Sequence, residues 1–371
     1  MILRSLGTRS FRNLRDASIE FHPSANIFVG DNGQGKTNLL EAVYLLATTR
    51  SFRTTRTARL ARLGAPSLFV EGLVEDAQKI ERRLSIGIAA ESERRRELLV
   101  NGQKATLQQY LAHLPVFAYS AARLEIIRGG PEERRRFLDR GIASIRPAYV
   151  GELSRYTRAL RQRNALLQSI AERKRSGKEL VSWNRELVES AIPIASARDA
   201  YASELALEAK KIAAAHAYHL EDLEFIYRPS GFEDGISIES GVAALHALKG
   251  RESSAGFTLA GPHRDQLEIL QKGQPAAEIL SSGEVKMTVL FLKLGKVELY
   301  RRETDGEPLF LLDDIDAELD LSIIERLLAY LIGSIQLFTT SPKSSFPDRF
   351  SLGDHRRFRV EEGMITEASE R

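Results

Sequence analysis

The strongest constraint on the fold of this chain is the octapeptide at residues 30–37, which reads GDNGQGKT. It follows an apolar run at 25–29 that is typical of a buried strand, and it precedes apolar residues at helical spacing. A glycine-rich turn between a strand and a helix, ending in Lys and Thr, is the pattern of a phosphate-binding loop. The alternative is a chance glycine-rich turn, which the flanking elements disfavour. The sequence therefore predicts an α/β nucleotide-binding fold.

The chemistry of phosphate binding assigns a task to each part of this loop. Backbone N–H groups of the turn and of the helix start would surround the β-phosphate. Gly33 and Gly35 permit backbone angles and a close approach that a Cβ obstructs. Lys36 would reach the β- and γ-phosphates, and the Thr37 hydroxyl would bind Mg²⁺. The expected nucleotide contacts are Gly30, Asp31, Asn32, Gly33, Gln34, Gly35, Lys36 and Thr37.

Two adjacent carboxylates, Asp313 and Asp314, follow an apolar run at residues 308–312. A desolvated acid at the end of a buried strand is costly without a cation or a donor. Asp313 therefore suits Mg²⁺ coordination, and Asp314 suits positioning or deprotonating the attacking water. A solvated turn is the alternative for the pair taken alone, but its combination with the phosphate loop favours a hydrolytic site.

A third candidate element is the SSGE tetrapeptide at residues 281–284, before a long helical stretch. Ser281 and Glu284 have the spacing of a capping box, which by itself explains a helix start. A serine, a glycine and a helix N-terminus also make an anion site. Ser281, Ser282 and Gly283 are therefore candidate nucleotide contacts, and both interpretations stay open.

Charge is distributed unevenly along the 371 residues, although the formal net charge is only +3. Residues 1–62 carry ten basic and four acidic side chains, and residues 121–180 carry fifteen and seven. Residues 303–330 carry nine acidic side chains and one basic. Arginine-rich composition also arises from genome composition or growth temperature, so charge alone does not require a polyanionic partner. Basic stretches beside a nucleotide site nevertheless favour DNA as a binding partner.

Other features exclude whole classes of protein. The chain has no cysteine, which excludes disulfides, thiolate metal sites and cysteine nucleophiles. No apolar run approaches the roughly 20 residues that cross a bilayer. The first residues lack the apolar core of a signal peptide. We therefore expect a cytoplasmic protein with no membrane partner.

The coarse pattern predicts a helical insertion within an α/β framework. Residues 2–21 alternate like an antiparallel hairpin, and Asn101-Gly102 predicts a tight turn. Helical periodicity dominates from about residue 120, and Pro193 is expected to kink a long helix over 180–220. Strand-like residues return at 223–227 and 257–260. The expected domains are residues 1–115 and 250–371 for the nucleotide-binding head and residues 116–249 for the helical insert.

The order of these motifs resembles the ABC-type ATPases, and their detail is similar to the RecF family of SMC-like ATPases. The matching stretches cover nearly the whole chain in the family's order: 10–14, 33–42, 50–53, 134–139, 161–167, 261–265, 313–314 and 318–320. The resemblance implies an ABC-type P-loop ATPase head, a mixed sheet with helices, that carries an inserted and mainly helical second domain.

The resemblance also implies an ATP-dependent DNA-binding protein of recombinational repair and replication restart, linked to the SOS response. ATP and Mg²⁺ would join two copies into a homodimer, each phosphate loop facing residues 281–283 of the other copy, with Asp320 near the seam. The dimer would clamp gapped DNA or a junction of single and double strands. Slow, DNA-stimulated hydrolysis would release it. RecR and RecO are the implied protein partners in recombinase loading.

Two positions and one segment depart from the family's pattern. Glu284 stands where Gln is more frequent, and Gln266 stands where a second acid usually follows Asp265. Residues 336–342 contain no equivalent of the switch histidine of ABC transporters. The missing histidine favours a slow switch over rapid turnover.

Several alternatives stay open from the sequence. The nucleotide-binding subunit of an ABC transporter shares the loop, the signature and the acids, but not a basic helical insertion of about 100 residues. A nuclease would need a further cluster of metal-binding acids. Arg12 and Arg53 suit phosphate contact and a solvated surface equally. His263 suits a structural or phosphate-facing role better than metal binding.

Overall fold

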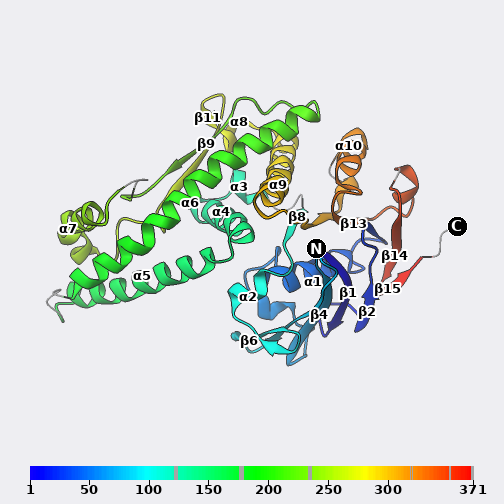
Figure 1. Ribbon diagram of the computed structural model, residues 1–371, viewed down its shortest axis with the longest axis horizontal. Coiled ribbons are helices and arrows are strands. Elements are labelled where there is room, and N and C mark those ends of the chain that lie inside the picture. Colours follow the sequence, from blue (N-terminus) through cyan, green and yellow to red (C-terminus); the bar gives the residue numbers. More distant parts are fainter. Residues whose placement is uncertain are drawn as a thin grey trace. The chain divides into compact units, whose positions relative to one another are not determined.

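We describe the fold from a computed structural model, which covers residues 1–120, 124–174, 179–232, 236–317, 319, 321–350 and 352–368. The chain divides into two compact units. One consists of Met1–Arg123 with Lys296–Arg371, and the other is Leu124–Gly295. Figure 1 traces both in sequence colours.

The first unit contains an antiparallel sheet with the strand order β2-β1-β4-β5-β6-β7. The strands are β1 (Ile2–Arg9), β2 (Ala17–Glu20), β4 (Ser67–Glu75), β5 (Glu81–Ala89), β6 (Ser92–Val100) and β7 (Gln103–Lys104). The hairpin predicted at 2–21 is confirmed as the β1–β2 pair. The predicted turn is confirmed too, because Asn101 and Gly102 have φ of 51° and 77°, as a two-residue hairpin loop requires.

The same unit contains a second sheet, ordered β15-β14-β3-β13-β12-β8. Its strands are β3 (Ala25–Val29), β8 (Val116–Ser120), β12 (Leu309–Asp313), β13 (Gln336–Ser341), β14 (His355–Glu361) and β15 (Met364–Glu367). All are parallel except the edge strand β15. Strands β3 and β12 are buried along their whole length, as in parallel sheets covered on both faces. Parallel strands end at one edge, so the residues after β3 and β12 come together there.

Helix α1 (Lys36–Thr48) lies between the two sheets, because it contacts β4 and β5 of the first and β8, β12 and β13 of the second. Its side chains Leu39, Leu40, Val43 and Leu46 are fully buried in one cluster with residues of both sheets. This burial fixes α1, and with it the loop that precedes it. The shorter helices of the unit are η1 (Thr57–Leu60), α2 (Leu107–Leu111), η2 (Ile315–Ala317), α10 (Leu321–Leu331) and η3 (Pro347–Arg349).

The second unit is mainly helical, and Figure 1 shows its long helices α5 and α6 side by side. Its helices are α3 (Glu125–Arg128), α4 (Pro131–Ile145), α5 (Tyr149–Ala171), α6 (Leu180–Ala215), α7 (Ile238–Ala255), α8 (Ala276–Ile279) and the first part of α9 (Ser282–Thr304). An antiparallel sheet holds β9 (Leu223–Arg228), β10 (Gln266–Gln271) and β11 (Gln274–Pro275). Residues 250–295 join this unit because β10 pairs with β9. The domain boundaries expected from the sequence, after residues 115 and 249, stay a prediction.

The long helix expected over 180–220 is confirmed as α6, which includes Pro193 and ends at Ala215, and the kink at Pro193 stays a prediction. One detail differs from the sequence-based expectations. Residues 257–260 form a loop instead of a strand, because Thr258 bonds Asn164 of α5 through its N–H at 2.9 Å and its hydroxyl at 2.6 Å. Among the described helices, none combines the length and the apolar composition that a membrane span requires.

Candidate nucleotide site

The phosphate loop connects the end of β3 to the start of α1. Gly30, Gly33 and Gly35 have φ of 155°, 84° and 117°, a region that L side chains rarely adopt. A Cβ at Gly30 would lie 2.2 Å from the Val360 carbonyl oxygen, so the approach of β14 also requires glycine there. Within the described chain, no side chain caps α1 and no acid lies in its first turn. Its first N–H groups therefore face outward as anion donors.

Lys36 is buried, with 4% of its surface exposed. Its Nζ donates hydrogen bonds to the carbonyl oxygens of Gly30 and Asp31, at 2.7 and 3.0 Å. These acceptors are neutral, and Lys36 forms no ion pair with any described residue. A buried ammonium without a countercharge is unfavourable. An anionic phosphate therefore fits this position.

The phosphate loop touches the carboxylate at the end of β12. Thr37 Oγ1 donates a hydrogen bond of 2.8 Å to Asp313 Oδ1, and Thr340 Oγ1 donates to the same oxygen at 3.0 Å. Burial raises the pKa of Asp313 above its ordinary value, and the neighbouring Asp314 charge adds to the shift. A desolvated carboxylate beside a hydroxyl supplies oxygen ligands of the kind Mg²⁺ prefers. Sequence reasoning missed Thr340, whose one signal is its place near the end of the neighbouring strand β13.

Asp314 follows with a left-handed backbone, φ 48°, and its N–H donates to Thr340 Oγ1 at 2.8 Å. Thr340 thus accepts from Asp314 and donates to Asp313, which fixes the two acids relative to each other. Asp314 is only partly buried, whereas Asp313 beside it is buried. A non-glycine residue in this conformation is often found at functional sites. The geometry suits a base acting next to a metal ligand.

The turn between β14 and β15 forms hydrogen bonds with the phosphate loop. The N–H groups of Glu362 and Gly363 donate to the Gln34 side chain and carbonyl, at 2.6 and 2.9 Å. From the other end of the chain, Asn13 Nδ2 donates to the Gly33 carbonyl at 3.3 Å. No sequence pattern near residue 362 predicted that this turn contacts the phosphate loop. Asn13 was noted in the sequence only as part of the family motif at 10–14.

The tetrapeptide at 281–284 forms the predicted capping box. Ser281 N–H donates to Glu284 Oε2 at 2.8 Å, and Glu284 N–H donates to Ser281 Oγ at 3.3 Å. The hydrogen bonds from Ser281 lower the pKa of Glu284. Ser281, Ser282 and Gly283 are exposed at the start of α9, and their role in binding nucleotide stays a prediction. Asp320, expected near the seam, lies outside the described residues.

Arg12 and Arg53 meet the same buried carboxylate. Arg12 donates Nε and Nη2 to the two oxygens of Glu41, at 2.9 and 3.0 Å, and Glu41 is fully buried. Arg53 lies 3.6 Å from Glu41 and donates to Asn38 at 2.6 Å. Without Arg12, Glu41 would be a buried charge lacking its main partner. Arg12 therefore stabilises α1, and the phosphate contact that the sequence left open for Arg12 stays a prediction.

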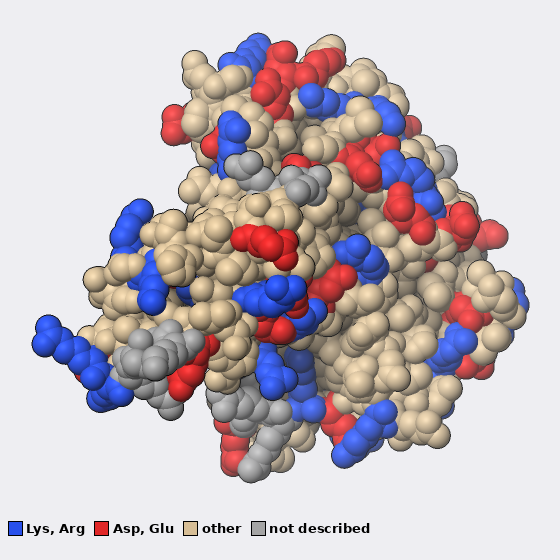
Figure 2. Space-filling model, turned by 60° about the vertical axis from the view of Figure 1, so that its left-hand side comes forward, with Lys and Arg blue, Asp and Glu red and all other residues tan. Residues whose placement is uncertain are grey.

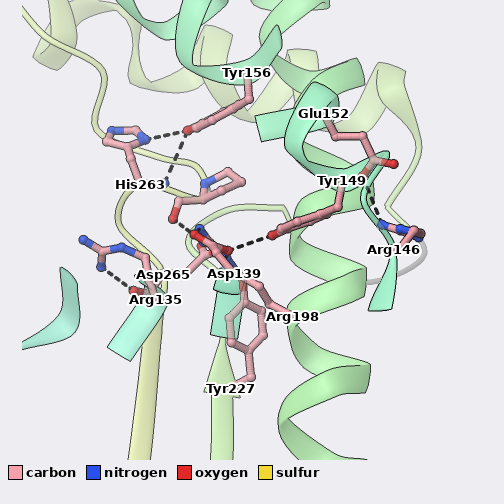
Figure 3. Close-up of polar contacts among 11 residues, drawn as sticks. Arg135, Asp139, Arg146, Tyr149, Glu152, Tyr156, Arg198, Tyr227, His263 and Asp265 are labelled. Carbon is pink, nitrogen blue, oxygen red and sulfur yellow. Dashed lines mark hydrogen bonds and ion pairs between the residues drawn. The ribbon is translucent and has the colours of Figure 1, made fainter. Parts of the chain in front are cut away.

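His263 lies in a buried polar cluster of the helical unit (Figure 3). Its Nδ1 is 2.6 Å from Tyr156 Oη, and its Nε2 is 3.2 Å from the Thr258 carbonyl oxygen. A neutral ring satisfies both contacts by accepting at Nδ1 and donating from Nε2. Burial lowers the pKa of His263, which favours this neutral form. Since both nitrogens are engaged, the geometry favours a structural role over a metal site.

The same cluster explains two of the family motifs. Arg198 pairs with Asp139 through bonds of 2.8 and 3.0 Å, and Tyr149 donates to Asp139 at 2.8 Å. Tyr227 donates to Asp265, and Figure 3 shows these side chains converging. The motifs at 134–139 and 261–265 therefore build the interior of this unit.

Many of the basic side chains at 121–180 form hydrogen bonds or ion pairs with other residues of the protein. Arg134 and Arg135 donate to the carbonyls of Leu267 and Asp265, at 2.9 and 2.7 Å. Arg163 pairs with the fully buried Glu252. On the face that Figure 2 shows, basic and acidic side chains are interspersed. The exposed arginines of this segment that form no ion pair with a described residue are Arg128, Arg140, Arg158, Arg161 and Arg173.

A phosphate-loop helix between an antiparallel and a mainly parallel sheet, with a hydroxyl–carboxylate contact at the strand ends, defines an ABC-type P-loop ATPase head with a mainly helical insertion. The profile of the RecF/RecN/SMC N terminal domain matches residues 2–351. With relatives named RecF matching over nearly the full chain, the protein belongs to the RecF family. The predicted fold class and family are confirmed.

The relatives are similar over almost their whole length. The DNA replication and repair protein RecF of Listeria welshimeri is 33% identical over 98% of this chain and 99% of that protein. Its counterpart in an Anaeromyxobacter species is 35% identical over 99% of each. The solved structure of the recombination mediator protein RecF with ATP, in the RecFOR pathway, has a TM-score of 0.89 at 29% identity, covering 99% of this chain and 98% of that one. An Smc head bound to a domain of ScpA has a TM-score of 0.55 at 15% identity over 99% and 97%, which shows the fold alone.

Proposed function

We propose that this protein is an ATP-switched DNA-binding protein of recombinational repair and replication restart. The observation that carries the proposal is the 2.8 Å hydrogen bond from Thr37 to Asp313, which joins the phosphate loop to the strand that ends in two acids. Relatives named as DNA replication and repair proteins, and a solved relative with ATP, support this setting.

The residues of the phosphate loop and the two acids after β12 have separate roles in hydrolysis. Backbone N–H groups from Gly30 to Thr37 hold the phosphates, and Lys36 exchanges its carbonyl acceptors for phosphate oxygens. Thr37 and Asp313 would hold Mg²⁺, and the bound ion would supply positive charge that stabilises the phosphate oxygens. Asp314 orients the attacking water and accepts its proton.

Nucleotide binding joins two copies of the chain into a homodimer. Ser281, Ser282 and Gly283 of one copy close on the phosphate loop of the other, with Asp320 near the seam. The exposure of this tripeptide at the start of a 23-residue helix supports the assignment. Because β13 carries no histidine, hydrolysis is slow, and DNA stimulates it.

The dimer clamps DNA at gaps or junctions and releases it after hydrolysis. Exposed arginines hold the phosphates without reading sequence, so affinity falls steeply with salt. RecR and RecO are the proposed partners in recombinase loading and the SOS response, because a solved relative acts in the RecFOR pathway. We place the protein in the cytoplasm.

Sedimentation with and without ATP tests the switch. Wild type should dimerise only with ATP, Lys36→Ala should stay monomeric, and Asp314→Asn should form a persistent dimer because hydrolysis is blocked. Lys249→Ala, at an exposed position of α7, is the control and should behave as wild type. A dimer equally strong without nucleotide would contradict the proposal.

A further inference from the structure

A groove of about 610 Å³ lies on the antiparallel sheet, where β1, β4, β5 and β6 run side by side. Its lining includes Arg9, Phe69, Gly87, Arg96 and Glu97. None of these residues belongs to the phosphate loop, the β12 carboxylates or the start of α9. The volume falls within the range of about 300–1,000 Å³ that ligand sites occupy.

The strand register leaves an aromatic ring uncovered in this groove. Arg9 pairs with Phe69, Phe69 with Gly87, and Gly87 with Glu97, so the four positions form one row across the sheet. Directly paired residues project from the same face. Phe69 is partly exposed, and Gly87 contributes no side chain beside it. A Cβ at Gly87 would lie 3.8 Å from Phe69 Cδ2, in contact with the ring.

Two arginines line the groove, Arg9 in the row of Phe69 and Arg96 in the neighbouring row, where it pairs with Ile88. Arg9 and Arg96 are exposed, and neither forms a hydrogen bond or an ion pair with a described residue through its side chain. The Arg9 guanidinium carbon is 5.9 Å from the Phe69 centroid, at the outer limit of a cation–π contact. The one acidic lining residue, Glu97, lies 3.3 Å from Lys104. Arg9 has Asp16 as a nearby acidic group, and Arg96 forms no ion pair with a described residue.

We propose that this groove binds a single strand of DNA, with an unpaired base stacked on Phe69 and flanking phosphates against Arg9 and Arg96. Aromatic rings and cations together are the means by which single strands are held without regard to sequence. A duplex keeps its bases stacked on each other and presents only phosphates to such a site. The groove therefore distinguishes a single strand from a duplex. This inference rests on the proposed function, since it assigns one DNA contact of the same protein.

Fluorescence anisotropy with a labelled oligothymidine of about 15 nucleotides, and with a duplex of equal length, tests the site. Phe69→Leu should weaken single-strand binding about five-fold or more and leave its salt dependence unchanged, because no phosphate contact is lost. Arg96→Gln should weaken binding and lower the salt slope by about 0.7, the share of one phosphate.

Gly87→Val gives a second test that does not depend on losing a side chain. Gly87 lies in β5 without a positive φ, so valine fits the strand and should keep or raise the unfolding temperature. It should nevertheless cover the ring and weaken single-strand binding as much as Phe69→Leu. Arg83→Gln, on the same strand and paired with Glu71 at 3.6 Å, is the matched control.

Unchanged single-strand binding by Phe69→Leu and Gly87→Val overturns the inference. An equal loss of duplex binding overturns it as well, because a base would then have no part in recognition. ATP-dependent dimerisation of Phe69→Leu should equal that of wild type. Failure at the groove is therefore distinguishable from failure of the proposed ATP switch.

Discussion

Thr37 Oγ1 and Asp313 Oδ1 are 2.8 Å apart, although 276 positions separate the two residues in the chain. The contact exists because β3 and β12 belong to one parallel sheet, whose strands all end at the same edge. It places the hydroxyl of the phosphate loop on the carboxylate that the proposed Mg²⁺ site needs.

Replacing Thr37 by valine should weaken Mg²⁺-dependent ATP binding while leaving Mg²⁺-free binding nearly unchanged. Valine keeps the shape of threonine but removes the hydroxyl, so one metal ligand and one donor to Asp313 are lost. We expect roughly a ten-fold loss, the size of about 1.4 kcal/mol. Nucleotide titration with and without Mg²⁺ measures it. Thr37→Ser retains the hydroxyl and should bind as wild type, and equal affinities for Thr37→Val and wild type in Mg²⁺ would contradict the assignment.

Asp313→Asn should stabilise the nucleotide-free protein at neutral pH. Burial raises the pKa of Asp313, so this group contributes stability below its ordinary value of 3.8 and loses it as pH rises through the folded value. At pH 7 the buried charge is unfavourable, and asparagine removes it while both threonine hydroxyls can still donate to its oxygen.

Thermal unfolding of wild type and Asp313→Asn measures this gain in stability. The unfolding temperature should rise by roughly 2–4 °C at neutral pH, as about 1 kcal/mol does for a domain of this size. The gain should vanish near about pH 3, where Asp313 is protonated in both states. Asp354→Asn changes an exposed acid and should have no effect. An unchanged unfolding temperature at neutral pH would show that Asp313 is not penalised by burial.

Arg12→Ala should destabilise the protein far more than Arg59→Ala. Arg12 makes two hydrogen bonds to the fully buried Glu41, whereas the Arg59 side chain is exposed and forms no hydrogen bond or ion pair with a described residue. Removing one partner of a buried carboxylate costs about 3 kcal/mol or more, and a surface change stays within about 0.5 kcal/mol. Urea unfolding provides the comparison. Equal stabilities would mean that Arg12 is free to serve another role.

His263→Gln should flatten the dependence of stability on pH. Burial lowers the pKa of His263, so the stability it contributes is present above its ordinary value of 6.5 and is lost as pH falls through the lower, folded value. The slope from one such group reaches about 1.4 kcal/mol per pH unit. Burial lowers the pKa of His22 and His113 too, so the informative quantity is the difference between wild type and variant in urea unfolding from about pH 7.5 to 5. If the free energy of unfolding changed with pH equally in wild type and His263→Gln, a buried neutral His263 would be contradicted.

Local patterns predicted much of the fold and the core of the candidate site. The phosphate loop, the hairpin at 2–21 and the turn at Asn101 were visible because each depends on residues close in sequence. Long-range hydrogen bonding was not visible. Residues 257–260 have a strand-like composition, yet the side chain of Asn164 holds the N–H of Thr258, so these residues form a loop.

The sequence by itself determined the family, the glycine positions of the phosphate loop and the acidic end of β12, because backbone angles and residue chemistry are local properties. Only the tertiary structure decided which charged residues are exposed and which pair with a carboxylate in the interior. Arg12, Arg163 and Arg198 look like a basic surface in one dimension, but each neutralises a carboxylate in the interior. Burial without a partner is prohibitive for an ion, so these three ion pairs stabilise the fold. Arg9 and Arg96, in contrast, are exposed where they line the groove of the antiparallel sheet, and neither forms an ion pair with a described residue.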